Sequence, residues 1–133
     1  MRRNWEITVG TNYYVAENVC ECCNRYDKKY HIGKSSWGWA FSFQGYKYDG
    51  LTSWQKWKEH LKDKKIYDEY NELIDYESFV EYIETEKAPN YVRPKDGRKN
   101  LVHNEEGRKE GWFNPNYDWD DPEGYSFCSR EFS

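Results

Sequence analysis

Three of the four cysteines in this chain lie close enough together to bind one metal ion. Cys20 and Cys23 have the C-x-x-C spacing that lets two thiolates of one tight turn reach a single zinc ion. The next residue, Asn24, tolerates the left-handed backbone that such a turn uses after its second cysteine. The pattern predicts a zinc-binding turn, with Cys22 as a substitute for either ligand. Cys128 lies far away in the sequence and is expected to be a small buried apolar side chain.

Two histidines are candidates for the remaining zinc ligands. His31 follows the cysteines closely, and His103 lies in a later polar segment, so a structural Cys2His2 site would join the two segments. The alternative is that Cys20 and Cys23 are reduced thiols and that the two histidines are unrelated to them. His60 is interpreted as a solvated surface histidine.

The tetrapeptide Gly33-Lys34-Ser35-Ser36 is similar to the end of a phosphate-binding loop. The complete motif needs an earlier glycine where this chain has Lys28, and a helix where an aromatic strand is expected, so we disfavour an NTPase. A turn of this composition still offers backbone N–H groups, hydroxyls and an ammonium group to a phosphate or carboxylate. The alternative is a turn that leads into a strand, with Lys34 in solvent. The candidate ligand-binding residues are Lys34, Ser35, Ser36, Trp37, Trp39, Arg93 and Arg98.

Two further kinds of site are open on the residues alone. The basic segment 93–109, combined with aromatic stacking, is typical of a nucleic-acid-binding surface. His31 and His103 could instead join Asp118, Asp120 and Asp121 in a metal-dependent phosphodiesterase. That enzyme is the less favoured alternative, because catalytic zinc sites prefer histidine and carboxylate ligands to cysteine pairs.

Composition limits the class of protein that carries these residues. The 133 residues have a formal net charge of −4, which argues against non-specific coating of nucleic acid. Aromatic residues make up 20% of the chain, so we expect a folded core built from large rings. No apolar run approaches a membrane span and no signal-peptide core follows Met1, so we expect a protein of the cytoplasm that does not bind membranes.

Periodicity predicts the elements that position the candidate residues. Alternating apolar residues predict strands over 5–9, 13–15 and 37–43, the last with aromatic side chains at every odd position, and a closing strand over 125–132. Ser53 and Asp75 are candidate N-caps for helices over 53–65 and 75–87. Residues 66–74 form an extended excursion or a tight hairpin. These elements predict a single α+β domain over 1–133, in which two helices pack on a small antiparallel sheet and 90–121 is a long polar loop region.

The runs Thr11-Asn12-Tyr13-Tyr14, Asn18-Val-Cys-Glu-Cys-Cys-Asn-Arg25, His31-Ile-Gly-Lys-Ser-Ser36 and Gly38-Trp39-x-Phe41 are distinctive together. They resemble the pattern TNYY…NVCxCCGR…HIGKSSxGWxF of a family of small tailed-phage proteins of uncharacterised function. The likeness covers residues 11–43 closely and the rest more loosely. Asn24 stands where the family normally has glycine. The resemblance implies a phage accessory protein made in the host bacterial cytoplasm, and it brings no activity with it.

These observations together favour a non-catalytic protein that acts by stoichiometric binding, as an inhibitor of a bacterial anti-phage defence system. Its partner is expected to be either a host defence protein, as for an anti-CRISPR-like inhibitor, or a signalling nucleotide that it sequesters. Capture of a protein predicts an exposed aromatic patch, whereas sequestration of a nucleotide predicts a closed pocket and an oligomer.

Overall fold

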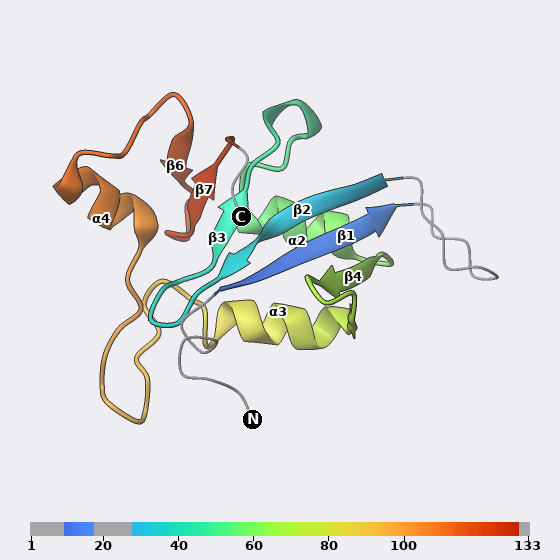
Figure 1. Ribbon diagram of the computed structural model, residues 1–133, viewed down its shortest axis with the longest axis horizontal. Coiled ribbons are helices and arrows are strands. Elements are labelled where there is room, and N and C mark those ends of the chain that lie inside the picture. The colour runs from blue at the N-terminus through green and yellow to red at the C-terminus, as the bar shows by residue number, and fades with distance from the viewer. Residues whose placement is uncertain (1–9, 18–27, 131–133) are drawn as a thin grey trace.

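The computed structural model describes residues 10–17 and 28–130, which form a mixed α+β fold (Figure 1). Seven strands of this part of the chain make one sheet in the order β5-β4-β1-β2-β3-β7-β6. All neighbouring strands are antiparallel except β3 and β7, which run parallel. The strands are β1 (Thr11–Glu17), β2 (Lys28–Ser35), β3 (Ser42–Gln44), β4 (Lys65–Asp68), β5 (Leu73–Ile74), β6 (Asp118–Asp120) and β7 (Ser126–Cys128).

Two of the helices were expected from their caps and apolar stripes. The helix α2 (Trp54–Leu61) begins after Ser53, whose hydroxyl accepts the backbone N–H of Lys56, and α3 (Tyr76–Glu84) begins after Asp75, whose carboxylate accepts that of Ser78. The predicted helices over 53–65 and 75–87 are confirmed, although both end a few residues early. A short 3-10 helix, η1 (Lys47–Asp49), precedes α2.

The core lies between the sheet and the pair α2 and α3; in Figure 1, α2 is behind β1 and β2, and α3 is below β1. It is aromatic to an unusual degree, because Phe43 contacts the rings of Phe41, Trp54, Tyr125 and Phe127. The N–H and O–H groups of the tryptophans and tyrosines in the core form hydrogen bonds at its edges. The Trp57 indole N–H, for example, donates to the backbone oxygen of Gln44 at 3.0 Å.

The predicted aromatic strand over 37–43 is wrong over residues 37–41. Only Ser42–Gln44 belongs to a strand, and Trp39 makes an isolated bridge to Leu101. The chain turns at Gly38, whose φ of 84° is open to glycine at no steric penalty, and the backbone N–H of Trp39 closes the turn on Ser36. Trp37 is therefore half exposed rather than part of the core.

Gly33-Lys34-Ser35 is also placed differently from the predicted turn, because it completes β2 and pairs with β1 and β3. A Cβ atom on Gly33 would lie 2.2 Å from the backbone oxygen of Ser42, so only glycine allows the two strands to approach this closely. The predicted extended structure over 13–15 is confirmed as part of β1, and the excursion over 66–74 as the hairpin of β4 and β5. The closing strand predicted over 125–132 is confirmed only over Ser126–Cys128, as β7, and residues 131–132 lie outside the described residues.

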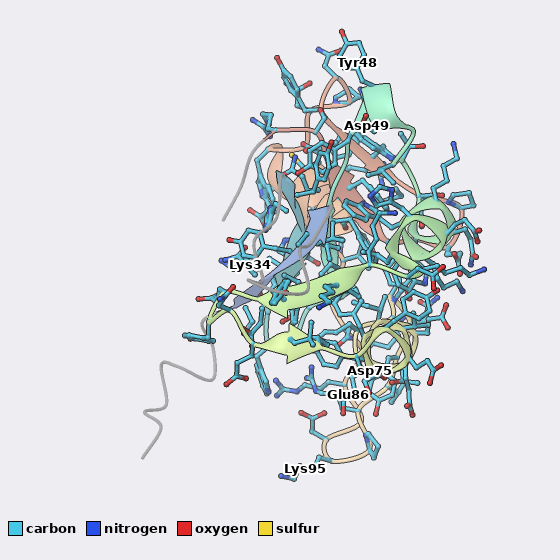
Figure 2. The ribbon with its side chains drawn as sticks, turned by 90° about the vertical axis from the view of Figure 1, so that its right-hand side faces the viewer. Lys34, Tyr48, Asp49, Asp75, Glu86 and Lys95 are labelled. Carbon is cyan, nitrogen blue, oxygen red and sulfur yellow. The ribbon has the colours of Figure 1, made fainter. Side chains whose placement is uncertain are left out.

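The segment 90–121 is not a long loop. Residues 91–100 form a hairpin that projects from the body, with Lys95 at its far end (Figure 2), and they are followed by a third helix, α4 (His103–Glu110), and by β6. The sequence predicts two helices, whereas the described residues contain three α-helices. The predicted strand over 5–9 lies outside the described residues. No helix in the described part of the chain has the length and apolar character needed to cross a membrane.

Candidate functional site

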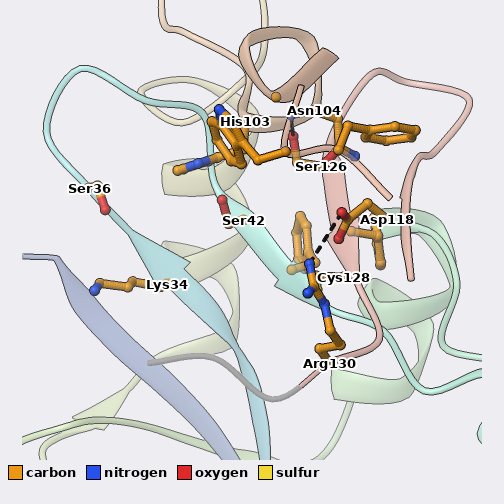
Figure 3. A pocket seen from close by; sticks show the side chains of 14 residues that line it. Lys34, Ser36, Ser42, His103, Asn104, Asp118, Ser126, Cys128 and Arg130 are labelled. Carbon is orange, nitrogen blue, oxygen red and sulfur yellow. Dashed lines mark hydrogen bonds and ion pairs between the residues drawn. The ribbon is translucent and has the colours of Figure 1, made fainter. Parts of the chain in front are cut away.

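A cavity of about 280 Å³ opens between β3, β7 and α4 (Figure 3). Its apolar wall is aromatic, with Phe43 and Phe127 stacked at a centroid distance of 4.9 Å and nearly parallel. Phe113 and the half-exposed Trp112 close it on the side of α4. Walls of this kind favour a planar, apolar ring of a ligand.

Ser42 brings an unpaired hydroxyl to this wall. Its Oγ is buried and finds no hydrogen-bond partner in the described part of the chain. A buried hydroxyl without a partner is destabilising by roughly 1–3 kcal/mol, so such groups are rare in folded proteins. The backbone of Ser42 is fixed by its pairing with Lys34 on one side and Ser126 on the other, so the hydroxyl cannot leave the cavity by a local strand movement.

His103 lies beside Ser42 in the cavity and is uncharged at neutral pH (Figure 3). Burial, and secondarily the charge of Lys34, lowers the pKa of its imidazole to about 4. The ring stacks on Trp39 at a centroid distance of 4.3 Å, which fixes its plane. A neutral imidazole offers one hydrogen-bond donor and one acceptor, so His103 can bind a polar ligand edge without demanding a charge on it.

Cationic groups stand on two sides of the cavity. Lys34 and Ser36 come from the end of β2, whereas Arg130 follows β7 on the other side of Ser42 (Figure 3). Arg130 is 3.5 Å from the buried carboxylate of Asp118, which also accepts the backbone N–H of Asn114. The two cations outweigh this single carboxylate, so the cavity suits a ligand that carries a negative group.

The position of α4 depends on polar rather than apolar residues. The buried side chain of Asn104 donates to the backbone oxygen of Trp119 and, at 2.9 Å, to the carboxylate of Asp120, while its backbone N–H donates to Ser126 Oγ. Gly107 lets Trp112 and Phe113 fold back against the helix, since both donate backbone N–H groups to its oxygen. Because α4 has no apolar stripe, helical periodicity could not reveal it.

Cys128 lines the same cavity as a free thiol. Burial raises the pKa of this thiol above its ordinary value, and the carboxylate of Asp118 adds to the effect. It is therefore protonated at neutral pH and acts as a weakly polar part of the wall, close to the small apolar role expected from the sequence.

The structure divides the predicted ligand-binding residues into three groups. Lys34 and Ser36 line the cavity, and Trp39 supports it by stacking on His103. Ser35 is buried and hydrogen-bonded to the hydroxyls of Tyr13 and Tyr82. The remaining three, Trp37, Arg93 and Arg98, gather at the projecting hairpin instead.

The histidines are held by different neighbours. His31 Nε2 is 2.8 Å from Asn12 Oδ1, and its Nδ1 is 3.5 Å from Gln44 Oε1. The expectation of a solvated His60 is wrong, because its ring packs edge-on against Trp57 and Tyr30 and is largely covered. Cys20, Cys22 and Cys23 lie outside the described residues, and within the described ranges no three His, Cys, Asp or Glu side chains are gathered as metal ligands. The zinc site stays a prediction.

The acidic residues suggested for a phosphodiesterase have structural partners. Asp121 accepts the backbone N–H groups of Trp54, Glu123 and Tyr125, and so fixes the start of α2 to the turn between β6 and β7. Asp120 binds Asn104 and Arg108. Asp120 and Asp121 therefore hold different parts of the fold in place, and their contacts do not indicate a shared metal ion.

Comparisons of the chain with protein-family models, with curated proteins and with solved structures gave no match. The chemistry of the cavity therefore has to be read from its own residues.

Proposed function

We propose that this protein is a phage-type accessory protein that acts without catalysis, by capturing a nucleotide-sized anionic ligand in the cavity between β3, β7 and α4. Withdrawing a signalling nucleotide in this way would inhibit a bacterial anti-phage defence system. The proposal depends above all on one observation: the Ser42 hydroxyl lines this cavity and has no hydrogen-bond partner among the described residues.

The groups around the cavity match the parts of a nucleotide. Trp112, which is 53% exposed, and the partly buried Phe113 supply an apolar surface for a base. Ser42 and His103 supply neutral hydrogen-bonding groups for its polar edge. Lys34 and Arg130 supply positive charge for a phosphate. A volume of about 280 Å³ is close to the lower end of small-molecule sites, so we expect one nucleotide unit per cavity.

Stoichiometric capture is favoured over catalysis by the state of the ionisable groups. The Cys128 thiol has a raised pKa, His103 has a lowered one, and Asp118 is engaged by Arg130 and the Asn114 N–H. A nucleophile needs a hydrogen-bonded base or a depressed pKa. Ser42 lies beside the neutral imidazole of His103, but its hydroxyl has no hydrogen-bond partner in the described part of the chain, so the two do not form such a pair.

Native mass spectrometry of the protein purified from a bacterial cytosol, without chelator, tests the proposal. We expect a nucleotide-sized mass excess, or one molar equivalent of binding when adenosine or guanosine monophosphate or a cyclic dinucleotide is added. A bare mass together with no binding of any of these probes would contradict it, and would favour a host protein as the partner.

The variant Ser42→Ala tests whether the Ser42 hydroxyl binds the ligand or supports the fold. Removing an unpaired buried hydroxyl should leave the free energy of unfolding unchanged or raise it by up to about 1 kcal/mol, while ligand affinity falls about tenfold. Ser129→Ala is the control, because that hydroxyl already donates to the Tyr117 oxygen and does not line the cavity. Loss of stability without loss of affinity in Ser42→Ala would show that the hydroxyl is structural.

A further inference from the structure

The hairpin over 91–100 is a second surface that the cavity does not use. It carries four basic residues and one acidic residue, in a chain whose formal net charge is −4. Its strands are joined by the bridge between Val92 and Lys99 and by hydrogen bonds from the Arg93 N–H to the Arg98 oxygen and from the Gly97 N–H back to the Arg93 oxygen. Figure 2 shows Lys95 at the end farthest from the sheet.

The base of the hairpin is fixed to the body of the protein. Asn100 is buried and donates through Nδ2 to the backbone oxygens of Glu86 and Ala88, at 2.8 and 2.9 Å. Lys87, just after α3, donates to the Ser36 oxygen at 2.8 Å and so holds the neighbouring turn. The hairpin and the turn at Trp37 therefore keep a defined relative position.

The one side-chain carboxylate of the hairpin forms its hydrogen bonds within the hairpin. Asp96 accepts the Arg98 N–H at 3.0 Å and the Arg93 Nε at 3.2 Å, and these two contacts lower the pKa of Asp96. Lys95, Arg98 and Lys99 are all exposed. An anionic partner therefore meets three outward cations.

Trp37 stands beside this charge as a stacking surface. The guanidinium of Arg93 lies over the indole, with Cζ 4.8 Å from the ring centroid, and 51% of Trp37 is exposed. About half of Trp37 thus stays accessible to an incoming planar group although Arg93 lies against its ring. An exposed indole beside cations suits the stacking of a base.

We infer that Trp37 and the basic hairpin 91–100 form a binding site for single-stranded nucleic acid. One base stacks on Trp37, and three phosphates along the strand contact Lys95, Arg98 and Lys99. Single strands are favoured over duplexes because stacking on Trp37 requires an unpaired base. The sequence predicted a nucleic-acid-binding surface over the basic segment 93–109, and we restrict it to the hairpin. The later cations are paired on α4, because Arg108 pairs with Asp120 and Lys109 with Glu106.

Binding of fluorescent single-stranded DNA and RNA oligonucleotides, measured by anisotropy from 50 to 300 mM salt, tests the inference. Three phosphate contacts predict that the logarithm of affinity falls with the logarithm of salt with a slope of about −2. Lys95→Gln/Arg98→Gln/Lys99→Gln should weaken binding and flatten the slope, whereas Trp37→Ala should weaken binding about tenfold and leave the slope unchanged.

The control is Lys56→Gln/Lys62→Gln/Lys109→Gln, which makes the same change of net charge at exposed positions away from the hairpin. The ratio of DNA to RNA affinity identifies which strand the site prefers. Equal weakening by the control variant, or unchanged binding in Trp37→Ala, would overturn the inference. So would binding of poly-L-glutamate that depends on the hairpin cations but not on Trp37, since that result would identify an acidic polypeptide as the partner.

Discussion

The cavity under α4 and the hairpin 91–100 are built on opposite principles. The cavity has a mainly apolar lining, contains a neutral histidine and has a cation on each of two sides, so binding there depends on desolvation and shape as well as on charge. The hairpin projects into solvent with exposed cations around a half-exposed tryptophan, so binding there depends on charge. A chain with a net charge of −4 can therefore contain one site whose affinity depends weakly on salt and another whose affinity depends on it strongly.

Lowering the pH should destabilise the protein through the cavity. The pKa of His103 is about 4 in the folded protein and 6.5 in the unfolded chain, so the unfolded state binds more protons between these values. The stabilisation is complete above pH 6.5 and is lost as the pH falls toward 4, by at most about 3 kcal/mol.

Urea denaturation of wild type and His103→Gln between pH 7 and pH 4 measures this effect. The difference in unfolding free energy between the two proteins should shrink or reverse as the pH falls. Parallel curves would show that His103 is not the group responsible.

Removal of the Asn104 side chain should release α4 and open the cavity. Asn104→Ala removes the side-chain donor to the Trp119 oxygen and leaves the Asp120 carboxylate with Arg108 alone, so we expect a loss of about 2 kcal/mol in unfolding free energy. Nucleotide binding should be lost, while oligonucleotide binding at the hairpin persists. Asn90→Ala, at an exposed position, is the control in the same denaturation assay and should change stability little.

Removal of the Asn100 side chain should give the reverse pattern. The oxygens of Glu86 and Ala88 lie near the surface, where water can replace the lost donor, so Asn100→Ala should destabilise by about 1 kcal/mol. Hydrogen exchange should show faster opening of 91–100, and oligonucleotide affinity should fall while the cavity still binds its ligand. Simultaneous loss of both activities would contradict the independence of the two regions.

The hairpin cations should contribute almost nothing to stability. Lys95, Arg98 and Lys99 are exposed, so replacing each by glutamine should change the unfolding free energy by less than about 0.5 kcal/mol. Thermal unfolding of the three single variants checks this. A larger loss of stability in any of them would mean that its side chain supports the fold. Weaker oligonucleotide binding by the triple variant could then reflect unfolding rather than the loss of phosphate contacts.

The elements with a strong apolar period were predictable from the sequence. The stripe of Trp54, Trp57 and Leu61 and the cap at Ser53 specify α2, and the same reasoning holds for α3. What failed was decided by contacts distant in sequence. The turn at Gly38 forms because Leu101 pairs with the 38–40 segment, and α4 is held by the polar side chain of Asn104.

The candidate site was predictable only in part. Lys34, Ser36 and His103 were singled out because of their types and now line one cavity, although His103 had been assigned to zinc. Ser42 and Arg130 were missed. The only sequence signal for Ser42 was a small residue between two phenylalanines, which is typical of many strands, and its significance comes from the lack of a partner within the described residues.

A calorimetric titration of the protein with nucleoside monophosphates at 50 and 300 mM salt tests the central claim most directly. The account predicts saturation at one ligand per chain, weaker affinity in Ser42→Ala and unchanged affinity in Lys95→Gln/Arg98→Gln/Lys99→Gln. No saturation at either salt concentration, or affinity that is lost in the hairpin variant and kept in Ser42→Ala, would contradict it.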